Sequence, residues 1–229
     1  MSEIASNIIS LKKSLPSTVR LVAVSKTRSV EDIMEAYNSG QKCFGENRVQ
    51  ELLNKKDHLP LDIEWHLIGH LQRNKVKFIV SFISMIQSVD SPRLLAAINE
   101  EAKKAGRVVN VLLQVHIAKE ETKFGFIQEE IELMVDAPEF SGLNNVRICG
   151  LMGMATYTSD NEQVGMEFRS LANLFNDLKK RYFNSDDHFR EISMGMSGDF
   201  DTAVKEGSTI VRIGSLIFGE RTKKDNQTL

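Results

Sequence analysis

Residues 21–26 read Leu21-Val22-Ala23-Val24-Ser25-Lys26, which is four apolar residues followed by a serine and a lysine. An apolar run of this length, rich in β-branched residues, is typical of a buried strand in a parallel sheet. Such a strand delivers Lys26 into a pocket at its carboxyl end, where a lysine can form an imine with a carbonyl compound. The alternative is a lysine that meets solvent where a strand ends.

Short apolar runs of this kind recur along the chain, and segments of helix length separate most of them. Alternating strands and helices indicate a parallel sheet with crossover helices, and about eight such units predict a (β/α)8 TIM barrel of the α/β class. Helices are expected at residues 2–14, 31–39, 47–55, 71–82, 90–105, 128–135 and 162–181. Strands are expected at residues 20–24, 42–45, 63–68, 85–89, 108–115, 146–152, 191–194 and 210–213.

The length of the chain indicates one domain. Its 229 residues are enough for one closed barrel, so we expect a single domain over residues 1–229 with a frayed polar tail at 222–229. The net charge of -2 provides no long-range basic field, and we expect no nucleic-acid partner.

Two features bear on where the protein works. The chain has only two cysteines, Cys43 and Cys149, each inside an expected strand, which fits free thiols in a reducing compartment. The N-terminal residues lack the order of a signal peptide, and no apolar stretch approaches the length of a membrane span. A cytoplasmic protein without a membrane partner is therefore expected.

Small residues follow the last two expected strands. In TIM barrels a phosphate often binds there, because backbone N–H groups and a short helix meet the anion. A phosphate-binding loop and a set of ordinary turn glycines both fit this pattern. If the loop does bind phosphate, a lysine across the mouth indicates either pyridoxal phosphate or a sugar-phosphate substrate of an aldolase. The residues are Gly195, Ser197, Gly198, Gly214, Ser215 and Gly219.

Six segments form a distinctive set that covers nearly the whole chain. They are Leu21-Val22-Ala23-Val24-Ser25-Lys26-Thr27, Phe44-Gly45-Glu46-Asn47-Arg48-Val49-Gln50-Glu51, Trp65-His66-Leu67-Ile68-Gly69-His70-Leu71-Gln72-Arg73-Asn74-Lys75, Cys149-Gly150-Leu151-Met152-Gly153-Met154, Ser193-Met194-Gly195-Met196-Ser197-Gly198-Asp199 and Val211-Arg212-Ile213-Gly214-Ser215-Leu216-Ile217-Phe218-Gly219. In these segments the chain resembles the pyridoxal phosphate homeostasis proteins of the YggS/PROSC type. That resemblance implies a fold-type III pyridoxal phosphate-binding barrel, like the alanine racemase N-terminal domain, without the C-terminal β domain of the racemases.

The resemblance also implies a role for each site residue. Lys26 would form the imine with pyridoxal 5'-phosphate, and Asn47 would line the face of the cofactor. Arg212 would face the pyridine nitrogen, and its alternative role is an ion pair with Glu46 or Asp199. The remaining assignments are a phosphate site made by Ser197 with the backbone of Gly214 and Ser215, and ring packing by Met154.

Two further groups of residues have open roles. Lys123 matches a lysine that recurs in the family, and it is either a second, transient aldehyde acceptor or a solvated loop lysine. His66 and His70 lack an acidic or cysteine companion at ligand spacing, so we expect no metal site and a structural role for His66.

Three functions fit this set of residues. The favoured one is a carrier that holds pyridoxal phosphate, takes part in vitamin B6 homeostasis and exchanges the cofactor with apo-enzymes, without turnover and as a monomer. The resemblance supplies this homeostatic role. A small amino-acid racemase is the second, although it would need a further acid or base at the mouth, for which Tyr157 is a candidate by position. A Schiff-base aldolase is the third.

Overall fold

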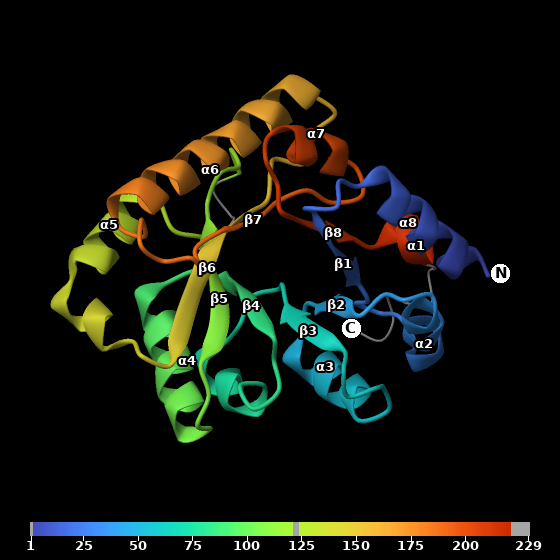
Figure 1. Ribbon diagram of the computed structural model, residues 1–229, viewed down its shortest axis with the longest axis horizontal. Helices are drawn as coiled ribbons and strands as arrows, with labels where there is room; N and C mark the ends of the chain where they lie inside the picture. The colour runs from blue at the N-terminus through green and yellow to red at the C-terminus, as the bar shows by residue number, and fades with distance from the viewer. Residues whose placement is uncertain (1, 121–123, 221–229) are drawn as a thin grey trace.

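The computed structural model describes residues 2–120 and 124–220, and it is a closed parallel barrel with strand order β1-β2-β3-β4-β5-β6-β7-β8 (Figure 1). The barrel closes where β8 pairs with β1, in a register that sets Arg20 opposite Ile210 and Ala23 opposite Ile213. The strands are β1 (Arg20–Val24), β2 (Cys43–Glu46), β3 (Glu64–Leu67), β4 (Met85–Val89), β5 (Val109–Val115), β6 (Val146–Gly153), β7 (Glu191–Ser193) and β8 (Ile210–Ile213). The predicted barrel and its eight strands are confirmed.

Helices surround the strands, as Figure 1 shows. The helix α2 begins with a capping box, in which the Ser29 hydroxyl accepts from Asp32 N–H and the Asp32 carboxylate accepts from Ser29 N–H. The helices are α1 (Glu3–Ser14), α2 (Val30–Asn38), α3 (Val49–Lys56), α4 (Pro92–Lys104), α5 (Gln128–Asp136), α6 (Asn161–Arg181), α7 (Phe200–Lys205) and α8 (Ser215–Phe218), with 3-10 helices η1 (Arg73–Phe78) and η2 (Pro138–Gly142).

The core has two parts. The larger part lies between the strands and the helices, where the spacing of Leu171, Leu174, Phe175 and Leu178 predicts a core-facing side of α6, and all four are buried. The smaller part fills the barrel interior and consists of Val22, Cys43, Met85, Leu112, Cys149, Met152 and Ile210. Buried polar side chains share this interior, and they connect it to the site described below.

Two expected helices differ from the structure. The helix expected at 71–82 is the 3-10 helix η1, in which Lys75 and Ile79 donate N–H bonds to the carbonyls three residues earlier. The helix expected from residue 47 starts at Val49, because Arg48 is extended. This extended segment carries Asn47 over the end of β2 toward the barrel mouth.

Two short helices, α7 and α8, were not expected from the sequence, because each is too short to show a helical period. The predicted tail at 222–229 lies outside the described residues. Of the helices in the described part of the chain, none has the length and apolar character needed to cross a bilayer.

Candidate functional site

A cavity of about 580 Å³ lies at the carboxyl ends of the strands, where TIM barrels carry their sites. The seven residues predicted to bind a cofactor all line it, although they come from five separate stretches of the chain. They are Lys26, Asn47, Met154, Ser197, Arg212, Gly214 and Ser215. Lys123, the predicted second aldehyde acceptor, lies outside the described residues.

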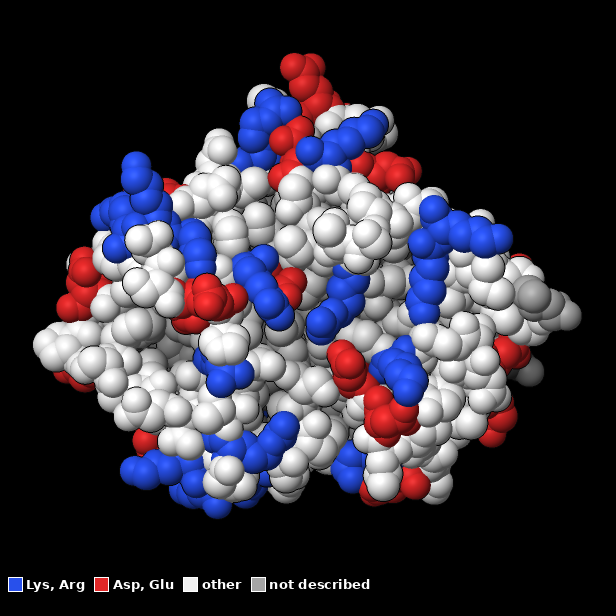
Figure 2. All heavy atoms as spheres, viewed as in Figure 1, with Lys and Arg blue, Asp and Glu red and all other residues white. Residues whose placement is uncertain are grey.

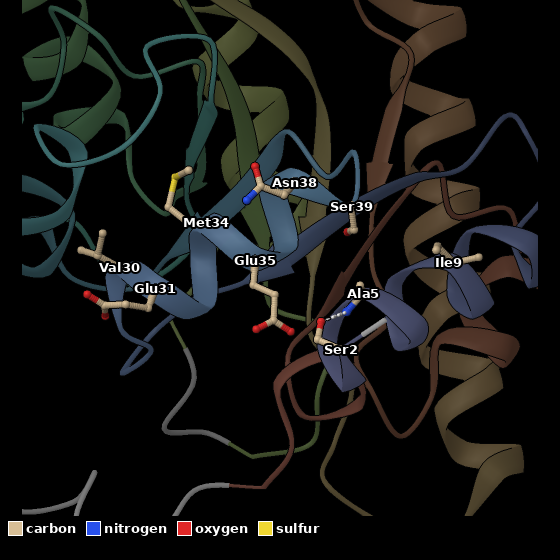
Figure 3. A pocket seen from close by; sticks show the side chains of 9 residues that line it. All are labelled: Ser2, Ala5, Ile9, Val30, Glu31, Met34, Glu35, Asn38 and Ser39. Atoms are coloured by element: carbon tan, nitrogen blue, oxygen red, sulfur yellow. Dashed lines mark hydrogen bonds between the residues drawn. The ribbon is translucent and has the colours of Figure 1, made fainter.

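A second cavity, of about 790 Å³, lies between α1 and α2 (Figure 3). Its wall combines the apolar side chains of Ile9, Val30 and Met34 with the carboxylates of Glu31 and Glu35. None of the residues that line it belongs to the barrel mouth. Of these two cavities, the mouth cavity is the candidate site, because a lysine, an arginine and a glycine-serine loop converge there.

The turn that carries Lys26 is held by several hydrogen bonds. Ser25 N–H donates to Gly45 O at 3.0 Å, which extends the β1–β2 pairing by one residue. Thr27 adopts the left-handed conformation with φ 65°, and its N–H donates to the Glu51 carboxylate. Arg28 N–H closes the turn on Ser25 O at 3.0 Å. These contacts fix the position of the Lys26 backbone beside the cavity.

A buried charged network lies under this turn. The Lys55 ammonium donates to Glu46 Oε1 at 2.9 Å, to Glu51 Oε1 at 2.6 Å and to Ser25 O at 2.8 Å. Glu46 Oε1 also accepts from the Ser25 hydroxyl at 2.7 Å. Burial raises the pKa of Glu46 to about 7, although the Lys55 charge opposes the shift. Within residues 2–120 and 124–220, Glu46 Oε2 has no hydrogen-bond partner.

The raised pKa of Glu46 makes stability depend on pH. In the unfolded chain this carboxyl loses its proton near 4.5, but the folded chain keeps it until about pH 7. The folded state therefore binds more protons between these values, and stability falls as pH rises across them, by at most about 3 kcal/mol. We expect Glu46→Gln to flatten this fall when urea unfolding is compared at pH 5 and pH 8. Glu129→Gln, at an exposed position, is the control, and an equal fall in both variants would contradict this assignment.

Arg212 lies buried on β8, with 4 % of its surface exposed. Its Nη1 donates to Ser193 Oγ at 2.6 Å, and its Nη2 donates to Gly153 O at 3.0 Å. Burial lowers the pKa of Arg212 to about 10, and the negative charge of Asp199 opposes that shift, so the guanidinium stays charged at neutral pH. Both of these acceptors are neutral, and the described residues show no hydrogen-bonded ion pair of Arg212 with Glu46 or Asp199, although the charge of Asp199 acts on the guanidinium.

The loops after β7 and β8 meet at one end of the cavity. Gly214 N–H points to Ser197 Oγ at 3.4 Å, which joins the two loops. Gly195 has φ 96°, and a Cβ there would lie 2.6 Å from Ala203 Cβ, so only glycine fits. Helix α8 starts at Ser215, and the N–H groups of Ile217 and Phe218 both donate to Gly214 O at 2.9 Å, so the N–H groups of Ser215 and Leu216 are the ones without a partner within the helix.

The cavity fits pyridoxal phosphate in three respects. The end with Ser197, Gly214 and Ser215 offers hydroxyl and backbone N–H donors, which match a phosphate group. Lys26 offers an amine for the aldehyde, and Arg212 offers N–H donors for a ring nitrogen. The apolar side chains of Val24, Ile68 and Met154 line the same cavity and suit a flat ring.

Sequence reasoning missed one cation in this site. Arg28 lines the cavity, and its Nη2 donates to Gly219 O at 2.5 Å, which ties the β1 turn to the end of α8. Its place two residues after Lys26 is the signal that could have identified it. On the face shown in Figure 2, basic and acidic side chains are interspersed, without a broad region of one sign.

His66 is fully buried and has a partner on each ring nitrogen. Its Nδ1 lies 2.8 Å from Gln87 Nε2, and its Nε2 lies 3.5 Å from Cys43 Sγ. Burial lowers the pKa of His66 to about 3, so the ring is neutral. Among the described residues, ligand atoms of Cys43, Glu64 and His66 lie within 4.8 Å of one another, so the fold gives His66 acidic and cysteine neighbours that the spacing in the sequence did not suggest. The expected absence of a metal site stays a prediction.

Comparisons with known proteins agree with this geometry. The family model for the alanine racemase N-terminal domain matches residues 1–222. The pyridoxal phosphate homeostasis protein of Aquifex aeolicus is 43% identical over 203 residues, covering 88% of this chain and 87% of its own. The solved structure of PipY from Synechococcus elongatus with pyridoxal phosphate bound is 36% identical, with a TM-score of 0.86, covering 94% of this chain and all of that one.

An alanine racemase of Clostridium difficile shares the fold alone, with 15% identity and a TM-score of 0.75 over 97% of this chain and 58% of its own. The identity to the homeostasis proteins is far higher and extends over most of both chains. This chain therefore belongs to the pyridoxal phosphate homeostasis protein family, whose barrel is that of the alanine racemase N-terminal domain.

Proposed function

We propose that this protein holds pyridoxal 5'-phosphate as an imine with Lys26 and takes part in intracellular pyridoxal phosphate homeostasis without catalytic turnover. One observation carries the proposal: Lys26, Arg212 and the Ser197–Gly214 contact lie around one cavity at the barrel mouth. The names of its relatives and the pyridoxal phosphate bound to PipY support the same cofactor.

Each residue has a definite task in this proposal. Lys26 supplies the amine, and Asn47 and Met154 contact the ring. Ser197, with the backbone of Gly214 and Ser215, binds the phosphate. When bound, the cofactor supplies an aldehyde that exchanges between amines and an electron-withdrawing ring. Arg212 can only donate a hydrogen bond, so it disfavours a protonated ring nitrogen and weakens that electron withdrawal.

The racemase alternative needs a second acid or base across the ring. Tyr157, the candidate by position, is 97% exposed, and its backbone N–H donates to Glu120 Oε1 at 3.2 Å. A phenol that is almost fully exposed is not held at a fixed place across the ring, as the second acid or base of a racemase must be. The aldolase alternative is not favoured, because the relatives are named for pyridoxal phosphate.

A carrier leaves the α-proton of amino acids in place. We expect the protein loaded with pyridoxal phosphate to exchange no α-proton of alanine or other amino acids in heavy water at an enzymatic rate, measured by proton NMR. An alanine racemase is the positive control, and free pyridoxal phosphate sets the background. Exchange well above that background, lost in Lys26→Ala, would show a racemase-like enzyme instead.

The cellular setting and partners follow from the same site. We place the protein in the cytoplasm, because Cys43 and Cys149 are free thiols of the kind that a reducing compartment maintains. We also propose that the protein is a monomer. Apo-enzymes that need pyridoxal phosphate are the proposed recipients. Reactivation of an apo-enzyme across a dialysis membrane, compared with direct mixing, tests whether delivery needs contact.

A further inference from the structure

Four buried polar side chains form a chain of hydrogen bonds with Arg212 through the interior of the barrel. Ser193 Oγ lies 2.6 Å from Arg212 Nη1 and 2.6 Å from Gln87 Oε1. Gln87 Nε2 lies 2.8 Å from His66 Nδ1, and His66 Nε2 lies 3.5 Å from Cys43 Sγ. We call these residues the interior chain, and they come from β8, β7, β4, β3 and β2 in that order.

The bond between Ser193 and Gln87 crosses the barrel. The strands β4 and β7 are separated by β5 and β6 in the sheet, so this contact spans the interior instead of joining neighbours. Gln87 and Ser193 have no exposed surface, and His66 has 1%. A buried polar group costs free energy unless it has a hydrogen-bond partner. Breaking one bond of the interior chain would therefore leave a buried group without its partner.

Arg212 sets the direction of every bond in the interior chain. A guanidinium only donates, so Ser193 Oγ accepts from Arg212 and its own proton goes to Gln87 Oε1. The Gln87 amide nitrogen then donates to His66 Nδ1, and the proton of the neutral ring sits on Nε2, toward Cys43. The reverse direction would leave the buried Ser193 proton without an acceptor among its contacts in the described residues.

Within the interior chain Arg212 bonds to a neutral group, and the charge of Asp199 acts on it from the cavity without a hydrogen bond among the described residues. Arg212 uses one N–H bond on Ser193 and one on Gly153 O, out of the five that a guanidinium has. A hydrogen-bonded carboxylate would neutralise the guanidinium, whereas the Ser193 hydroxyl orients the guanidinium and leaves its positive charge available to a ligand in the cavity. The cavity that Arg212 lines is the one assigned above to the cofactor.

We propose that Ser193 and Gln87 are positioning residues, which hold the Arg212 guanidinium in the cofactor cavity through the interior chain. This inference rests on the proposed function, because pyridoxal phosphate is the ligand that Arg212 meets there. Each link acts on the ligand only through Arg212. The effect of breaking a link must therefore depend on the presence of that arginine.

The first test is binding of pyridoxal phosphate. We expect Ser193→Ala and Gln87→Met each to raise the Kd about tenfold, because a misplaced guanidinium loses its bond to the ligand. In an Arg212→Met background, Gln87→Met should change the Kd by less than about twofold. The matched controls are Ser208→Ala and Gln114→Met. They remove a buried serine and a buried glutamine that do not belong to the interior chain.

The second test locates a proton in the unchanged protein. Nitrogen-15 NMR of histidine-labelled protein reports which His66 nitrogen carries the proton, with His66→Asn to assign the signal. We expect protonated Nε2 and bare Nδ1 at neutral pH. A proton on Nδ1, or equal effects of Gln87→Met with and without Arg212, would overturn the inference.

The outcomes separate this inference from the proposed function. Binding by the unchanged protein, with Ser193→Ala and Gln87→Met indistinguishable from their controls, would overturn the positioning role and leave the carrier function intact. No binding by the unchanged protein would overturn the proposed function and the role of Arg212 with it.

Discussion

Lys26→Ala is expected to abolish the visible absorption band that forms when pyridoxal phosphate is added to the protein. The band requires an imine between the aldehyde and an amine, and the structure places the Lys26 side chain among the residues that line the mouth cavity. The proposed phosphate contacts of Ser197 and Gly214 do not involve that amine. The Kd should therefore rise by about 100-fold, and some non-covalent binding should remain.

Lys104→Ala is the control for this prediction, because Lys104 lies exposed on α4 and pairs with Glu101. Absorption titrations of the three proteins, followed by equilibrium dialysis, measure both the band and the Kd. An unchanged band in Lys26→Ala would assign the imine to another lysine and would contradict the proposed site.

Gly150→Ala is expected to destabilise the barrel by more than about 4 kcal/mol, a large part of the stability of an ordinary domain. Gly150 has φ 147°, a conformation that side chains rarely adopt, and a Cβ there would lie 1.8 Å from Glu191 O. It follows a shift in the β5–β6 register between Val111 and Leu112, and it pairs with Glu191 on β7. The clash is with backbone, so no side chain can move to relieve it.

Urea unfolding followed by circular dichroism measures this loss. Gly142→Ala is the matched control, because no neighbouring atom lies within 4 Å of its added Cβ and its φ is ordinary. A Gly150→Ala protein that unfolds at the same urea concentration as the control would show that the β6–β7 pairing tolerates a side chain.

Much of the fold follows from the sequence because strands and their ends carry strong local signals. The run from Leu21 to Val24 is apolar because the strand is buried on both faces, and Lys26 follows where it ends. In a parallel barrel all such ends meet at one mouth, so residues as distant as Lys26 and Ser215 can be assigned to one cavity.

The interior chain could not be predicted in the same way. Gln87 and Ser193 lie on short strands that each carry another polar residue, Ser88 and Glu191, and nothing local shows that Gln87 and Ser193 face each other across the barrel, 106 positions apart. The α-helix expected at 71–82 was a wrong prediction, because the apolar spacing does not determine the hydrogen-bond pattern. Its buried residues Val76, Ile79 and Val80 fit the helical period, yet hydrogen bonding shows a 3-10 turn instead.

The most direct test of the cofactor site is to reduce the mixture of protein and pyridoxal phosphate with borohydride, digest it and map the modified lysine by mass spectrometry. The proposed site predicts one phosphopyridoxyl group on the peptide that contains Lys26, and none on that peptide in Lys26→Ala. Modification spread over exposed lysines, or confined to a lysine outside the cavity, would contradict it.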